Sequence, residues 1–203
     1  MFRCFYFRNF VEEKNDDFMT EFNDMQQVKR RFFAMRNGAV ADNMRRHGAD
    51  YRIIFGLNLP QIVEIAEATP HSSSLAEALW RNQSTRESML MAPMIFPRDE
   101  FGFEVACRWV SEAPTAEVAD VLCHRLLRHC DYAWQLAVAM MTSSKPMERY
   151  VALRLMSNLL QLNHLHCNEI ESYAVSEEAT NTPLTRHLCR QLIDEIEFLK
   201  EEN

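Results

Sequence analysis

A short basic segment is the first part of the sequence that suggests chemistry. It contains His124, Arg125, Arg128 and His129. The guanidinium group of arginine is a planar fork of N–H donors that matches a phosphate. This segment and Arg149 therefore suit contact with a nucleic-acid backbone. An ordinary solvated helix face is the alternative, and the sequence leaves both interpretations open.

A carboxylate and an indole ring follow this segment, at Asp131 and Trp134, with Tyr132 between them. Residues three apart on a helix lie on the same side, so the carboxylate and the indole are expected to be neighbours. Trp134 suits stacking on a base or a sugar, and packing between helices is the alternative. Asp131 lies where a new helix is expected to begin, and an aspartate at that position is usually an N-cap.

The same segment contains Cys123 and Cys130, and cysteine together with histidine can bind zinc. The spacing is not that of a zinc site and no second ligand pair follows, so we expect no metal. None of the six cysteines forms a Cys-x-x-Cys motif. Scattered cysteines in apolar helical stretches are typical of reduced thiols in a cytoplasmic protein.

Composition limits the classes to which the protein can belong. The chain has 203 residues, of which 47% are hydrophobic and 25% are charged, as in a soluble globular protein. It has no apolar run of roughly 18 residues, so no membrane span is expected. The formal net charge of −7 is unusual for a non-specific DNA-binding protein, although it allows a local basic face.

The elements that position these side chains are expected to be helices. Four glycines and seven prolines are too few for the turns of an all-β sandwich, and apolar residues recur at three- and four-residue steps. We predict an all-α fold, an α-solenoid of HEAT-like antiparallel helix pairs, with a closed helical bundle as the alternative. A single repeat domain is expected over residues 18–203, after an extension of uncertain order over residues 1–17. Helices are predicted over residues 18–36, 39–47, 60–68, 99–111, 116–129, 132–142, 146–162, 167–179 and 184–200, with two more after Ser72 and Ser84.

Local motifs predict how some of these helices begin and end. Residues 84–87, Ser-Thr-Arg-Glu, fit a capping box in which the Glu87 side chain reaches back to the Ser84 amide. Gly38 is expected to end the first helix in a left-handed conformation. Residues 51–59 form an apolar linker with Gly56 as its turn.

The order of these features resembles the DNA alkylation repair family, the HEAT-like-repeat alkylpurine DNA glycosylases. The resemblance rests on four features, none of which is specific alone, and it extends over about residues 40–160. They are the linker with Gly and Pro over residues 54–60, Leu79-Trp80 followed by Arg86-Glu87, the joint at residues 129–134, and Arg149 early in the next helix.

The resemblance implies a concave trough that holds duplex DNA and removes cationic alkylated purines without a metal or a redox cofactor. It makes Asp131 the candidate catalytic carboxylate, with Tyr132 and Trp134 as aromatic neighbours and Arg149 on the DNA backbone. A carboxylate and aromatic faces would stabilise the positive charge that develops on the sugar. Where the family tends to have Trp-Asp-x-x-Asp, this chain has Cys130 for the tryptophan and Trp134 for the second aspartate.

Two functions from different classes follow from the sequence. The first is binding of duplex DNA, with excision of alkylated purines left open because the second acid is replaced. The second is a non-catalytic helical-repeat scaffold that binds a protein partner. The oligomeric state is not predicted by either.

Overall fold

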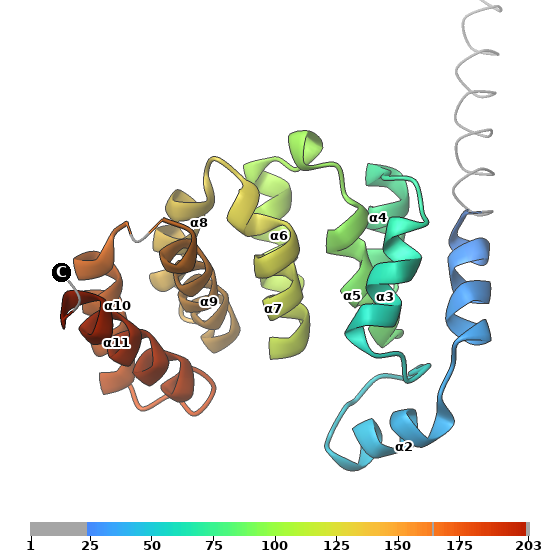
Figure 1. The fold of residues 1–203 in the computed structure, drawn as a ribbon, viewed down its shortest axis with the longest axis horizontal. Coiled ribbons are helices and arrows are strands. Elements are labelled where there is room, and N and C mark those ends of the chain that lie inside the picture. Colours follow the sequence, from blue (N-terminus) through green and yellow to red (C-terminus); the bar gives the residue numbers. More distant parts are fainter. Residues whose placement is uncertain (1–23, 164, 202–203) are drawn as a thin grey trace, which may run out of the picture. The chain divides into compact units, whose positions relative to one another are not determined.

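The computed structural model describes residues 24–163 and 165–201, so the predicted extension over residues 1–17 lies outside the described part. That part is almost entirely helical, as predicted, and it contains no strand beyond an isolated bridge between Ile53 and Thr85 (Figure 1). None of its helices is long and apolar enough to cross a membrane. The chain divides after Pro97 into two compact units, unit 1 and unit 2. A single repeat domain over residues 18–203 stays a prediction.

Unit 1 is built from helices that bury apolar faces against one another. A helix over residues 24–34 comes first in the described part. Helices α4 and α5 pack together, α3 packs on α5, and Trp80 is fully buried, as expected of a core residue. The labelled helices of unit 1 are α2 (Gly38–Arg46), α3 (Leu59–Glu67), α4 (Ser73–Arg81) and α5 (Arg86–Ile95).

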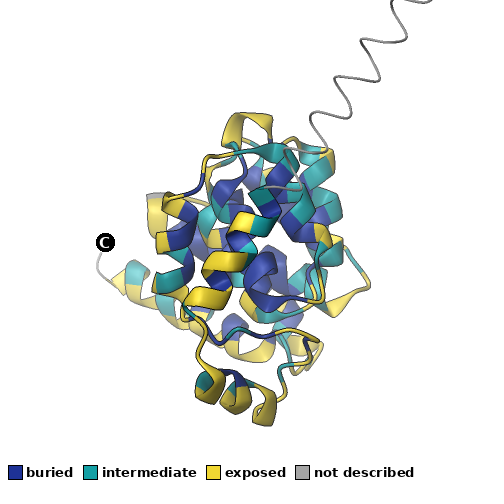
Figure 2. Ribbon diagram, turned by 90° about the vertical axis from the view of Figure 1, so that its right-hand side faces the viewer, coloured by how far each residue is buried: buried dark blue, intermediate teal, exposed yellow. Residues whose placement is uncertain are grey.

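Unit 2 is likewise made of packed successive helices. Helix α9 packs on α7 and α8, and α10 packs on α11. Trp109 is fully buried. Buried and exposed residues alternate along single helices (Figure 2), as the apolar periods of the sequence predict. The elements of unit 2 are η1 (Arg98–Glu100), α6 (Phe103–Glu112), α7 (Ala116–Arg125), η2 (Leu127–His129), α8 (Ala133–Met141), α9 (Pro146–Asn163), α10 (Cys167–Ala179) and α11 (Arg186–Glu201).

The predicted capping box at residues 84–87 is wrong. Thr85 is the N-cap of α5, and it makes no side-chain cap hydrogen bond. Glu87 is instead fully buried, and its carboxylate accepts hydrogen bonds from the backbone amides of Phe55, Gly56 and Leu57 at 3.1, 3.0 and 3.4 Å. A tertiary contact with the apolar linker has thus replaced the local cap.

A buried guanidinium accompanies this carboxylate. Arg86 is 4% exposed, and its Nη1 donates to the Leu57 carbonyl at 2.9 Å and to the Glu87 carboxylate at 3.3 Å. A buried charge is tolerated when it is paired and hydrogen-bonded, and both groups meet that condition here. The pair therefore fixes the linker against α5.

Two glycines in this region behave differently from each other. Gly38 was expected to end the first helix in a left-handed conformation, but it is the first residue of α2, with Asn37 as its N-cap. Gly56 does have a positive φ of 79°, as the predicted turn requires. A Cβ added at Gly56 would lie 2.1 Å from the carbonyl oxygen of Asn37, so the linker passes directly against the start of α2.

Candidate nucleic-acid interface

Two leucines explain how the predicted basic segment is displayed at the end of α7. Thr115 caps the start of this helix, its hydroxyl accepting a hydrogen bond from the Val118 amide, and the helix ends at Arg125. Leu126 and Leu127 are both buried. Because apolar side chains are favoured inside, these leucines leave the polar residues on either side of them at the surface.

Cationic side chains gather at this surface. Nη1 of Arg128 lies 3.1 Å from Nδ1 of His124, and Nε of Arg128 donates to Nε2 of His129 at 3.2 Å. Burial is the largest cause of the lowered pKa of Arg128, and the charges of Arg125 and of Arg98, the latter on η1, lower it further. We define the cationic patch as Arg98, His124, Arg125, Arg128 and His129.

The pKa of each histidine in the patch is lowered from its ordinary value. For His124 the largest cause is burial, followed by the charges of Arg128 and Arg125. For His129 the causes are burial and then the charges of Arg98, Arg128 and His124. The lowered pKa values favour neutral imidazoles near pH 7, so the positive charge of the patch lies on its arginines, and an arriving anion relieves the repulsion between them.

Within the part of the chain that the structure describes, the arginines of the patch are also without carboxylate partners. Among the described residues, Arg98, Arg125 and Arg128 form no ion pair with an aspartate or a glutamate. Asp99 and Glu100 follow Arg98 on η1, yet both are exposed and neither pairs with it. The guanidinium groups of the patch are therefore available to an anionic ligand.

Asp131 lies on the turn that follows the patch. The expectation that it caps a helix is wrong, because the N-cap of α8 is Tyr132 and no side chain provides the cap. Its carboxylate is exposed and makes no hydrogen bond with another described residue. Its charge helps to raise the pKa of the Cys130 thiol, for which burial is the largest cause.

The ring and the hydroxyl of Tyr132 are both engaged within unit 2. The hydroxyl donates a hydrogen bond to the Phe101 carbonyl, and the ring meets that of Phe103 edge to face, with the centroids 5.5 Å apart. Burial and a hydrogen bond with Cys130 raise the pKa of the phenol. Tyr132 therefore holds the start of α8 against the segment that leads into α6.

Trp134 is half-buried and stacks on another ring. Its indole lies parallel to the imidazole of His166, with the ring centroids 4.0 Å apart and the planes inclined by 8°. His166 has a φ of 61° and is the N-cap of α10. The indole thus covers the joint between α9 and α10.

Comparison with known proteins assigns the family. The model of a family described as "DNA alkylation repair enzyme" matches residues 28–200. The chain belongs to the DNA alkylation repair enzyme family. A search of the curated proteins finds no match.

One solved structure supports the fold of this family member. It belongs to "a new family of proteins related to the HEAT-like repeat DNA glycosylases with affinity for branched DNA structures". The two chains are 16% identical and superpose with a TM-score of 0.70, over 83% of this chain and 73% of the other. The HEAT-like helical-repeat fold predicted from the sequence is confirmed, and the closed bundle is not the fold.

The arginine that the family resemblance placed on the DNA backbone is bound inside the alkylation repair-like fold. Nε of Arg149 donates to the Glu177 carboxylate at 2.8 Å, and Nη1 donates to the Ser143 carbonyl at 2.9 Å. The side chains of Arg149 and Glu177 are only 15% and 3% exposed. Thr185 adds a hydrogen bond to the same carboxylate at 2.9 Å, so the arrangement ties α9, α10 and the start of α11 together.

Sequence reasoning missed two members of these arrangements. Arg98 lies far ahead of the basic segment in the chain, and Glu177 lies 28 residues after Arg149. No spacing rule connects such positions, because packing between separate helices brings them together. Within the described residues, no group of three or more histidine, cysteine, aspartate or glutamate side chains is arranged to hold a metal ion.

Proposed function

We propose that this member of the DNA alkylation repair family binds DNA through the cationic patch. The observation that carries the proposal is the set of three guanidinium groups that have no carboxylate partner among the described residues. Arginines that replace the counterions of DNA phosphates provide most of the affinity of such binding. A local patch of this kind works on an acidic body because the field near a phosphate depends on the nearest charges.

The comparisons support DNA as the ligand. The family is one of DNA repair enzymes, and the similar solved structure comes from proteins with affinity for branched DNA. Guanidinium forks that contact phosphates position a protein on DNA without reading its sequence. We therefore expect binding that depends on salt and on the shape of the DNA, and hardly on its sequence.

Excision of an alkylated base is the second candidate activity. It is favoured by one observation, the exposed and unpaired carboxylate of Asp131 directly after the patch. A carboxylate stabilises a developing cation most strongly where water is excluded, and Asp131 is in contact with water. The second acid of the family segment is Trp134 in this chain, and its indole is stacked on His166. Binding is therefore the function that we put first.

The test of binding is a fluorescence anisotropy titration with a labelled duplex and a labelled four-way junction, each at several salt concentrations. The double variant Arg125→Gln/Arg128→Gln removes two charges from the patch. If each contacts one phosphate, the slope of log affinity against log salt falls by about 1.8. The matched control is Arg190→Gln/Lys200→Gln, which removes two exposed charges that pair with Glu178 and Glu171 on the surface of unit 2.

Each outcome of this titration decides something. Weaker binding and a smaller salt slope in the patch variant, with the control unchanged, support the proposal. Equal effects of the two variants show that only net charge matters and contradict a specific patch. Absence of binding at low salt contradicts DNA binding altogether and favours the protein scaffold.

Excision is tested separately by release of free base from alkylated DNA. If base is released, Asp131→Asn should abolish the release without weakening binding, because the substitution removes the charge and keeps the size. Release that is unchanged in this variant would remove Asp131 from the chemistry.

A further inference from the structure

A second basic site lies in unit 1, where the helix over residues 24–34 meets α2 and the apolar linker. A cavity of about 310 Å³ opens between these segments. Cavities of this size hold small organic ligands. The residues that line it are Phe33, Arg36, Gly38, Ala41, Arg45, Arg52, Ile53, Ile54 and Phe55.

The lining combines apolar surface with positive charge. Phe33 is 56% exposed and Ile53 is 40% exposed, so the two side chains bring apolar surface into contact with water at the same cavity. Three arginines line the same cavity, and no aspartate or glutamate from the described part of the chain lines it. Of these arginines, Arg45 pairs with Asp42 at 3.4 Å on an exposed face of α2.

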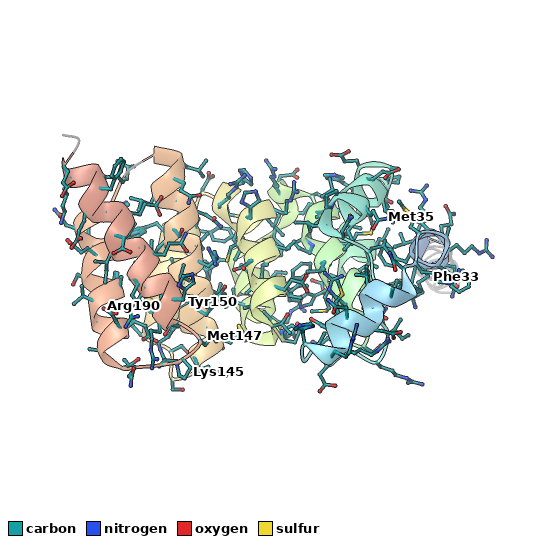
Figure 3. The ribbon with its side chains drawn as sticks, turned by 60° about the horizontal axis from the view of Figure 1, so that its bottom comes forward. Phe33, Met35, Lys145, Met147, Tyr150 and Arg190 are labelled. Carbon is teal, nitrogen blue, oxygen red and sulfur yellow. The ribbon has the colours of Figure 1, made fainter. Side chains whose placement is uncertain are left out.

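The side chain of Phe33 is already arranged as a stacking surface. The guanidinium carbon of Arg36 lies 3.8 Å from the centroid of the Phe33 ring, and its Nη1 donates to the Phe33 carbonyl at 2.9 Å. The guanidinium is therefore held over one face of the ring. Figure 3 shows Phe33, near the end of the helix over residues 24–34, and Met35, just after it, pointing to different sides, so Phe33 is turned away from the groove that Met35 lines beside α3.

Arg52 is the arginine of the cavity that has the most freedom. It is exposed, it follows the buried Tyr51, and it forms no ion pair or hydrogen bond with another described residue. An aromatic ring, a stacked guanidinium and a free guanidinium together match a flat base that carries a phosphate. A base that is paired and stacked within a duplex cannot present its face to a phenylalanine.

We propose that this cavity binds one unpaired nucleotide of a DNA strand, with the base on Phe33 and Ile53 and the phosphate on Arg52 and Arg45. The proposal rests on the proposed function, since it takes the ligand to be DNA. It adds a preference that the cationic patch alone does not provide, because guanidinium contacts with phosphates do not distinguish paired from unpaired bases.

The test compares two labelled DNA probes on the full chain, a matched duplex and the same duplex with one unpaired thymidine. The unmodified protein should bind the second probe more tightly, by about tenfold if one base stacks in the cavity. Phe33→Ala should reduce this preference to about onefold, and Arg52→Gln should reduce it in part. Loss of preference should be greater than any loss of affinity for the matched duplex.

Two matched controls guard against general effects. Phe198→Ala removes a phenylalanine that is 58% exposed on α11, so its effect on folding should be similar to that of Phe33→Ala. Arg46→Gln removes an exposed charge from α2 that does not line the cavity. Both controls should keep the preference for the unpaired thymidine.

A photochemical experiment locates the base directly. A 5-iododeoxyuridine at the unpaired position should crosslink, on irradiation, to the peptide that contains Phe33. A crosslink at another site, no preference in the unmodified protein, or a preference that survives Phe33→Ala would overturn the cavity proposal. If the Arg125→Gln/Arg128→Gln protein binds both probes normally, the proposal that the cationic patch binds DNA is wrong. The effect of Phe33→Ala on the preference still tests the proposal that the cavity binds a nucleotide.

Discussion

Two regions of unit 2 use arginine in opposite ways. At the joint of α9, α10 and α11, Arg149 binds the buried carboxylate of Glu177 and a backbone carbonyl. At the end of α7, Arg128 contacts two imidazoles and, within the described residues, no carboxylate. The comparison teaches that the partner decides the role: an arginine with a buried carboxylate stabilises the fold, and one without a carboxylate is available to a ligand.

The largest expected effect on stability comes from an arginine that is paired with a buried carboxylate, Arg86 in unit 1. Glu87→Ala removes the buried carboxylate that the Arg86 guanidinium and three backbone amides contact. We expect the free energy of unfolding to fall by about 3–5 kcal/mol, measured by urea denaturation. Glu67→Ala, at an exposed position of α3, is the control and should change it by less than about 0.5 kcal/mol. Equal effects of the two variants would refute the structural role of the pair.

The next effect sharpens the comparison at Arg149. Arg149→Met leaves the Glu177 carboxylate, which is 3% exposed, without its guanidinium, so unfolding should become easier by about 3 kcal/mol. Arg190→Met removes the partner of Glu178 from an exposed pair on the same helices and should cost less than about 1 kcal/mol. Thermal and urea unfolding measure both. Weakened DNA binding by a fully stable Arg149→Met protein would instead support the phosphate contact that the family resemblance implies.

A smaller effect on stability is expected at Arg128, which has no carboxylate partner among the described residues. Arg128→Gln should change the free energy of unfolding by no more than about 0.5 kcal/mol, because no carboxylate loses a partner. The same substitution should lower the affinity for DNA, measured in an anisotropy titration at low salt. A large loss of stability together with unchanged binding would place Arg128 with Arg149.

The sequence predicted the parts of the molecule that depend on local patterns. Apolar periods located most helices within a few residues, and α10 has the predicted bounds. The family and its fold followed from the order of motifs, and the basic segment at the end of α7 was found because its members are close in the chain.

The parts that failed depend on contacts between distant segments. Glu87 has the spacing of a capping box, but the amides of the linker bind its carboxylate more completely than the Ser84 amide would. Asp131 is a residue of the type that commonly caps helices, but the turn places Tyr132 at the N-cap of α8. Arg149 matches a family motif, and nothing in the sequence around it indicates Glu177 as its partner.

The smallest expected effect is a dependence on pH at the patch. The pKa values of His124 and His129 are lowered in the folded state, mainly by burial and next by the arginines. The unfolded chain therefore binds more protons below pH 6.5, the ordinary value, so stability should decrease slightly as the pH falls through that value. Replacing both histidines with glutamine should flatten the decrease in pH-dependent urea titrations, and a decrease of unchanged steepness would show that these imidazoles do not cause it.

The close approach of Gly56 to Asn37 has a consequence for how this sequence can drift. A side chain there would collide with the main chain itself, which no neighbouring rotamer can relieve, and its φ of 79° already disfavours any L-residue. Gly102 has open space around it and an ordinary conformation. A saturation library selected for folded protein should retain glycine alone at position 56 and admit many residues at position 102. Position 56 is therefore expected to stay glycine as the sequence evolves, whereas position 102 can change.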